Sequence, residues 1–223
     1  MPRHPRHFLF GVALVAGLIG ALAAAPDATS PVYALAVPPL ELVTTEAAFA
    51  PFAQRVAADV AGALKRQPPP DPARLKLLLG LRVHLALHFH DDAAALDAAE
   101  RIRALQTDPA EKAHAGLTTR ALVASKHEPR AFEREFTRLL RSLPRDPATR
   151  AVLVRAREKL ATTTETALLD EVRTNIAPRI AAGEPCTLEI ADQLVRIRHR
   201  LEGILPLRDA LLRSYDSVLS VSK

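Results

Sequence analysis

The stretch ALQTDPAEKAHAGLTTRAL (residues 104–122) shows how this chain begins its helices. Asp108 stands immediately before Pro109 in this stretch. An aspartate carboxylate accepts hydrogen bonds from the free backbone N–H groups of a first helical turn. Proline suits the next position, because its φ angle already fits a helix and its missing N–H costs no hydrogen bond there. Glu111 completes a capping box with Asp108, so the stretch predicts a helix that begins at residue 109.

The same Asp-Pro-Ala signal occurs three times, at residues 71–73, 108–110 and 146–148, with spacings of 37 and 38 residues. Short units at such a period cannot bury their apolar faces alone and must stack on their neighbours. We therefore expect a repeated helix pair of about 37 residues. The helices before the last two signals also correspond at an offset of 38, since both carry apolar residues at 4-4-3 spacing: Ala94, Ala98, Ile102 and Leu105, and Phe132, Phe136, Leu140 and Leu143.

Helical periodicity continues through the rest of the chain from about Glu46. Alternating Val/Ile/Thr runs and Asn-Gly or Asp-Gly hairpin turns, which are typical of strands, are missing from the sequence. The predicted fold is therefore all-α, with stacked antiparallel helical hairpins over residues 46–223 that form a short solenoid or a closed bundle. The leucine-rich segment 71–89 is apolar on nearly all faces, which predicts a central helix.

Residues 71–162 resemble tetratricopeptide repeats. The resemblance is carried by residues 104–122 and by FTRLLRSLPRDPATRAVLVRARE (residues 136–158), where an amphipathic helix ends, Asp-Pro follows and an Ala/Leu-patterned helix begins. The period of 37 to 38 residues is longer than the period of about 34 residues that is usual in that family. The resemblance implies an array of helical hairpins.

Residues 1–25 are predicted to be a signal peptide or an N-terminal membrane anchor. Arg3 and Arg6 precede the 18 uncharged residues 8–25, which end in small residues as secretory signals do. A stretch of 18 apolar residues also reaches the lower limit for spanning a bilayer. In both cases the arginines stay inside and the rest of the chain lies outside the cytoplasm. We expect a periplasmic or secreted protein, or alternatively one anchored in the inner membrane and facing outward.

Residues 26–45 contain four prolines and no helical period, which predicts an extended, proline-rich linker. Cys186, the sole cysteine, follows Glu184-Pro185 and is expected in the first turn of a helix, where the dipole lowers a thiol pKa. In an oxidising compartment a lone cysteine is either packed and inert or paired between chains.

Composition excludes several classes of protein. With 48% hydrophobic residues, 25% charged residues and one cysteine, the chain is neither disordered nor a disulfide-stapled mini-protein. The net charge is +5, but the charges are interleaved and no aromatic cluster is available to stack bases, so no nucleic-acid partner is expected. Glycine-rich phosphate loops and a G-x-S-x-G elbow are missing. We expect a protein that is not an enzyme and carries no cofactor.

His84, His88 and His90 are the candidate metal ligands. His84 and His88 stand four residues apart, so on a helix their imidazoles share a face and can chelate Zn²⁺ or Cu²⁺. His90 lies at the end of that helix, with two aspartates after it. The alternative is structural: the first two histidines fill the less apolar side of the helix, and His90 favours its C-terminus. No H-E-x-x-H pattern supports a zinc peptidase.

Arg196, Arg198 and Arg200 form the densest basic run and are a candidate surface for an anion or an acidic partner. The alternative is the solvated side of a helix whose other face is the apolar stripe of residues 190–204.

The expected function is that of an exported helical-repeat protein, which acts as a protein-binding adaptor or scaffold in the cell envelope. The inner faces of successive hairpins would bind a protein partner of unknown identity. One alternative is a small metal-binding helical bundle that uses His84 and His88. Another is a helical module tethered to the membrane through residues 8–25, with residues 26–45 as the tether.

Overall fold

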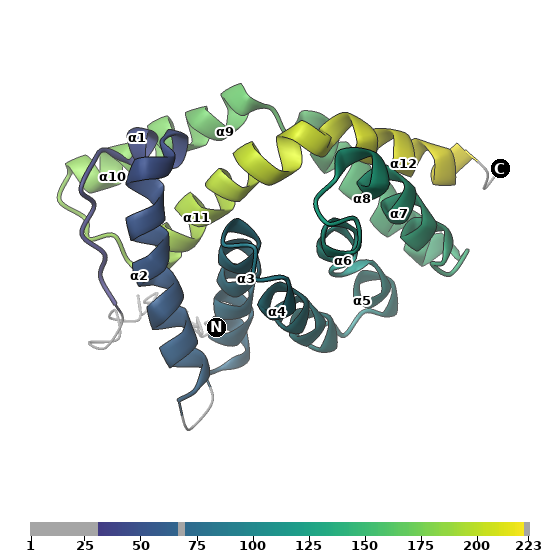
Figure 1. The fold of residues 1–223 in the computed structure, drawn as a ribbon, viewed down its shortest axis with the longest axis horizontal. Helices are drawn as coiled ribbons and strands as arrows, with labels where there is room; N and C mark the ends of the chain where they lie inside the picture. Colours follow the sequence, from purple (N-terminus) through teal and green to yellow (C-terminus); the bar gives the residue numbers. More distant parts are fainter. Residues whose placement is uncertain (1–30, 67–69, 221–223) are drawn as a thin grey trace, which may run out of the picture. The chain divides into compact units, whose positions relative to one another are not determined.

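The computed structural model describes residues 31–66 and 70–220, and these residues form an all-α fold (Figure 1). The prediction for residues 1–25 lies outside the described residues. No helix in the described part of the chain is long and apolar enough to cross a membrane. The elements are α1 (Pro39–Thr44), α2 (Glu46–Leu64), α3 (Pro72–His88), α4 (Asp92–Ala104), α5 (Pro109–His114), α6 (Leu117–Ala124), α7 (Pro129–Arg141), α8 (Pro147–Thr162), α9 (Glu165–Glu171), the π-helical turn η1 (Val172–Ile176), α10 (Ala177–Ala181), α11 (Leu188–His199), the π-helical turn η2 (Arg200–Ile204), the 3₁₀ turn η3 (Leu205–Leu207) and α12 (Arg208–Ser220).

All three Asp-Pro signals begin helices, as predicted. The Asp71 carboxylate accepts hydrogen bonds from the backbone N–H groups of Ala73 and Arg74 at 3.0 and 3.1 Å. The carboxylates of Asp108 and Asp146 each accept one from the residue three positions on, at 2.8 Å. The signals therefore mark the starts of α3, α5 and α8. The second unit differs from the first, because Gly116 adopts a left-handed conformation (φ 73°) and divides its helix into α5 and α6.

Successive helices form packed pairs: α3 lies against α4, and α6 lies against α7 (Figure 1). Helix α3 also contacts α2 and α11, which agrees with the central position predicted from its sequence. One side of α3 carries Leu78 and Leu81 into a first core, formed with α1, α2, η1 and α11. Its other side carries Leu79 and Val83 into a second core, formed with α4, α6, α7, α8 and α12.

The C-terminal elements contact both cores. Helix α11 packs against α1, α2 and α3, whereas α12 packs against α7 and α8. The short turns η2 and η3 join the two helices, as the yellow-green to yellow ribbon in Figure 1 shows. The segment 188–220 therefore packs along the helix pairs rather than adding one more pair to their end.

The prediction of an extended linker is wrong for residues 31–45; residues 26–30 lie outside the described residues. Pro38 and Pro39 begin helix α1 instead of interrupting one, because proline is well tolerated at the first helical positions. Leu42 and Val43 on this helix are buried in the first core. The backbone N–H of Tyr33 donates a hydrogen bond to the carbonyl of Cys186 at 2.8 Å. This segment is therefore part of the folded domain.

Candidate functional site

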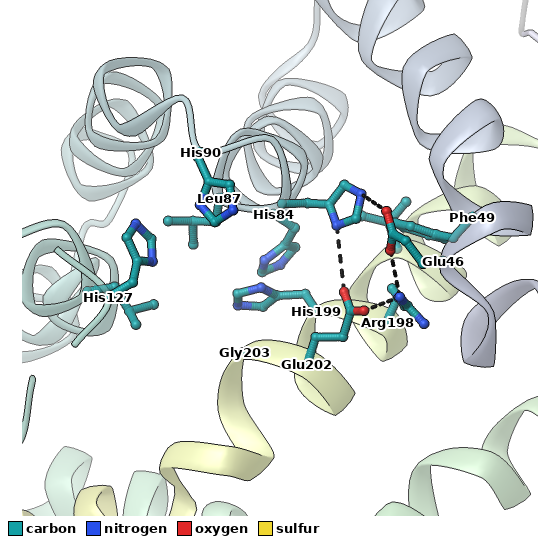
Figure 2. A pocket seen from close by; sticks show the side chains of 13 residues that line it. Glu46, Phe49, His84, Leu87, His90, His127, Arg198, His199, Glu202 and Gly203 are labelled. Atoms are coloured by element: carbon teal, nitrogen blue, oxygen red, sulfur yellow. Dashed lines mark hydrogen bonds and ion pairs between the residues drawn. The ribbon is translucent and has the colours of Figure 1, made fainter. Parts of the chain in front are cut away.

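One pocket, with a volume of about 340 Å³, collects five of the chain's eight histidines (Figure 2). Its walls come from the start of α2, the C-terminal half of α3, the α6–α7 turn and the α11–η2 junction. These segments are far apart in the sequence, so the pocket is a product of tertiary packing. The lining side chains are His84, His88, His90, His127 and His199, the charged residues Glu46, Arg198 and Glu202, and the apolar residues Phe49, Leu87, Leu122 and Val195, together with Gly203.

His88 lies between two carboxylates. Its Nε2 atom is 3.5 Å from Glu46 Oε1, and its Nδ1 atom is 3.6 Å from Glu202 Oε2. One ligand atom from each residue can be chosen so that all three lie within 4.8 Å of one another. Within residues 31–66 and 70–220, this Glu46–His88–Glu202 group is the one set of three potential metal ligands that meets so closely.

Arg198 holds the two carboxylates of this group. Its buried guanidinium pairs through Nη2 with Glu46 at 2.7 Å and also with Glu202. Through Nη1 it donates a hydrogen bond of 3.0 Å to the carbonyl of Val43, at the end of α1. The guanidinium also lies over the ring of Phe49, 5.4 Å from the ring centre. One guanidinium cation thus faces two carboxylates.

His84 and His199 lie ring to ring in the inner part of the pocket, with ring centres 4.5 Å apart. Burial lowers the pKa of both imidazoles, and neighbouring positive charges add to the effect. The pKa of His199 falls to about 4, and that of His84 falls well below its usual value. Both rings are therefore neutral at pH 7, which is the form of histidine that binds metals. His84 Nδ1 is buried and has no hydrogen-bond partner within the described residues.

The backbone beside His199 makes room for its ring. A Cβ atom on Gly203 would lie 3.2 Å from His199 Cε1, a contact tighter than most Cβ atoms make. Gly203 belongs to the π-helical turn η2, which starts immediately after His199. Single π-helical turns inside α-helices are frequent at functional sites.

His90 and His127 lie at the exposed edge of the pocket. Their ring centres are 5.4 Å apart and their planes are perpendicular. His127 Nε2 is bonded to Asp92 Oδ1 at 3.0 Å. Both histidines have left-handed backbones, with φ of 56° and 60°.

The three histidines predicted as ligands from the sequence all line this pocket, but they do not share one ligand set. His88 joins Glu46 and Glu202, His84 faces His199, and His90 faces His127. Sequence reasoning missed the other four titratable lining residues: Glu46, His127, His199 and Glu202. One signal was available for His127, which stands 37 residues after His90, at the period of the helix pairs.

The prediction of one exposed arginine surface is wrong, because Arg198 is buried and paired with carboxylates. Arg196 is exposed and pairs with Asp192, and Arg200 lines a different pocket beside Leu160 and Tyr215. Residues two positions apart on an α-helix point in nearly opposite directions, so the three side chains cannot share one face.

Cys186 is packed and inert, as one of the two expected alternatives had it, but it does not lie in the first turn of a helix and its pKa is not lowered. It lies before α11, is 3% exposed, and its pKa is raised to about 11 by burial. A thiol in such surroundings packs as a small apolar side chain.

Comparisons with protein-family models, with curated proteins and with solved structures gave no match to this chain.

Proposed function

We propose that this protein binds a divalent transition-metal ion in the histidine pocket, with Glu46, His88 and Glu202 as ligands. The observation that carries the proposal is the convergence of these three ligand atoms within 4.8 Å, from α2, α3 and η2. Imidazole nitrogen and carboxylate oxygen are a donor set that Zn²⁺ accepts. Imidazole also suits Cu²⁺ and Ni²⁺.

The charges around the group support this proposal. Glu46 and Glu202 together carry two negative charges, and Arg198 supplies only one positive charge. A divalent cation is therefore attracted to the remaining negative charge. The pairing of Arg198 with both carboxylates would also orient them, as outer partners of metal ligands commonly do.

Metal binding is tested by stripping the purified protein with a chelator and titrating it with Zn²⁺ and Cu²⁺ in a calorimeter. The variants Glu46→Gln and His88→Gln should weaken binding at least tenfold, because each removes a ligand. His114→Gln is the matched control, because His114 contacts Tyr215 outside the pocket. Circular dichroism verifies that each variant is folded. Wild-type protein that binds neither ion, or binding that both pocket variants leave unchanged, would overturn the proposal.

A second candidate function is a protein-binding adaptor of the cell envelope. Phe89 at the end of α3 is 39% exposed and borders a groove of about 260 Å³, lined by Val60 on α2 and Leu85 on α3. Exposed aromatic side chains beside such grooves are frequent anchors at protein interfaces. The packed helix pairs and the resemblance to tetratricopeptide repeats support the same role. Export through residues 1–25, by cleavage or as a tether, is part of this candidate function.

The adaptor role is tested by affinity capture from an envelope extract with the wild-type protein and with Phe89→Ser. A partner retained by the wild type and lost with the variant supports it, whereas a reproducible lack of partners contradicts it. N-terminal sequencing of the exported protein separates cleavage from tethering.

A further inference from the structure

We propose a second metal-ion position at the exposed edge of the pocket, with His90 and His127 as its protein ligands and Asp92 as the residue that positions His127. This position uses none of the ligands of the Glu46–His88–Glu202 group. It therefore goes beyond the site proposed above and stands or falls separately from it.

The repeated helix pairs bring these two histidines together. His90 and His127 stand 37 residues apart, and each lies directly before the residue that caps the next helix, Asp91 for α4 and Glu128 for α7. The two turns are thus equivalent positions of successive helix pairs. Because the pairs pack side by side, the two imidazoles reach the same pocket, with ring centres 5.4 Å apart.

The separation of the rings suits one shared ion. Two imidazoles that bind a tetrahedral ion through Zn–N bonds of about 2.0–2.1 Å hold their ring centres about 5 Å apart. The observed 5.4 Å is therefore close to the bridging distance. His90 is exposed and the side chain of His127 is 30% exposed, so an ion can reach both from solvent.

Asp92 prepares His127 for this role. A carboxylate that accepts a hydrogen bond from Nε2–H fixes the proton on that nitrogen and leaves the Nδ1 lone pair free for a metal. The 3.0 Å bond from His127 Nε2 to Asp92 Oδ1 has this arrangement. Pairs of a carboxylate and a histidine of this kind are common around bound zinc.

The backbone of both turns is left-handed where the preceding helix ends. His90 and His127 have φ of 56° and 60°, the left-handed region that glycine occupies most easily. Glycine itself occupies this region at residues 116 and 183 of the same chain. Lys126 is left-handed as well, with φ of 50°. These conformations end α3 and α6, where the N–H of Asp91 bonds to the carbonyl of Ala86 and the N–H of His127 bonds to the carbonyl of Leu122.

This position is tested by titrating the chelator-stripped protein with Zn²⁺ alone and counting the ions bound per chain. We expect two ions for the wild type, with the edge position weaker because it has only two protein ligands. His90→Asn and His127→Asn should each remove the ion at the edge position. Asparagine tolerates a left-handed backbone, so both variants should keep the conformation of the turns. Asp92→Asn should weaken the same ion about tenfold. His114→Asn is the control and should still bind two ions.

The two metal proposals give different results in this titration. One ion lost with His90→Asn and the other with Glu46→Gln supports both positions. A single ion lost with His90→Asn but not with Glu46→Gln supports only the edge position. A single ion lost with Glu46→Gln alone, or two ions retained by both histidine variants, overturns the edge position.

Discussion

The Nη1 group of Arg198 donates a hydrogen bond of 3.0 Å to the backbone carbonyl of Val43, which stands 155 residues earlier in the chain. The bond joins the end of α1 to α11. The same guanidinium pairs with Glu46 and Glu202, so it links the N-terminal segment to the wall of the histidine pocket.

Arg198→Ala should therefore lower the free energy of unfolding by about 3 kcal/mol, because it leaves a buried carbonyl and two carboxylates without their cation. Urea denaturation measures the loss. Arg155→Ala is the control, since Arg155 pairs with Glu111 at an exposed position and should contribute less than about 1 kcal/mol. An equal loss of unfolding free energy in the two variants would contradict the stabilising role of the Arg198 contacts.

Acid should destabilise the fold through His84 and His199. Their pKa values are lowered in the folded protein, to about 4 for His199, while the unfolded chain binds protons near pH 6.5. The contribution of these two groups to the free energy of unfolding is fully present above pH 6.5. It is lost as the pH falls from there towards 4. The loss approaches about 1.4 kcal/mol per pH unit for each ring.

Urea denaturation of metal-free protein between pH 6.5 and 5 checks this sign, because few carboxylates titrate in that window. His199→Gln should flatten the dependence of the unfolding free energy on pH. An identical slope in the wild type and the variant would show that His199 is not held neutral by the fold.

Cys186 should be inert in the folded protein. Its side chain is 3% exposed, and burial raises its pKa to about 11. At pH 8 the sulfur is therefore inaccessible to reagents and remains a protonated thiol. A chromogenic disulfide reagent should label it only after urea is added. Rapid labelling without urea, or a disulfide-linked dimer on a non-reducing gel, would contradict this packing.

His90→Gly should raise the free energy of unfolding by up to about 1 kcal/mol, because glycine adopts the left-handed backbone without strain. Gly183→Ala is the matched opposite change. Gly183 has φ of 88° with open space around a Cβ, so alanine there costs backbone strain alone, about 1 kcal/mol. Thermal denaturation measures both changes. A His90→Gly protein less stable than the wild type would show that the imidazole contributes to the fold itself.

Helix starts could be predicted from the sequence because capping is local chemistry. Asp71, Asp108 and Asp146 bond to N–H groups two or three residues away, so the signal and its result lie in the same turn. Helix α1 could not be found in this way. Its prolines are compatible with a linker or a helix start, and what selects the helix is the burial of Leu42 and Val43 in the first core.

The candidate site could be predicted from the sequence only in part, because most of its residues meet through tertiary packing. The spacing of His84 and His88 is a local signal, whereas Glu46 and Glu202 reach His88 through the packing of α2 and α11 around α3. The position of Arg198 in the sequence also indicates its burial. It stands four residues after Leu194, one turn along the apolar face, so it belongs with the buried side of α11.

Helix α3 lies between the two cores and carries leucines into both of them. Displacement of α3 would expose both cores to water at once, so we expect neither half of the domain to unfold independently of the other. Amide hydrogens in α2 and α12 should then exchange with solvent in a common cooperative event. Opening of the structure beside α3 is thereby coupled to unfolding of the whole domain, and its rate becomes a property of the fold rather than of any one contact.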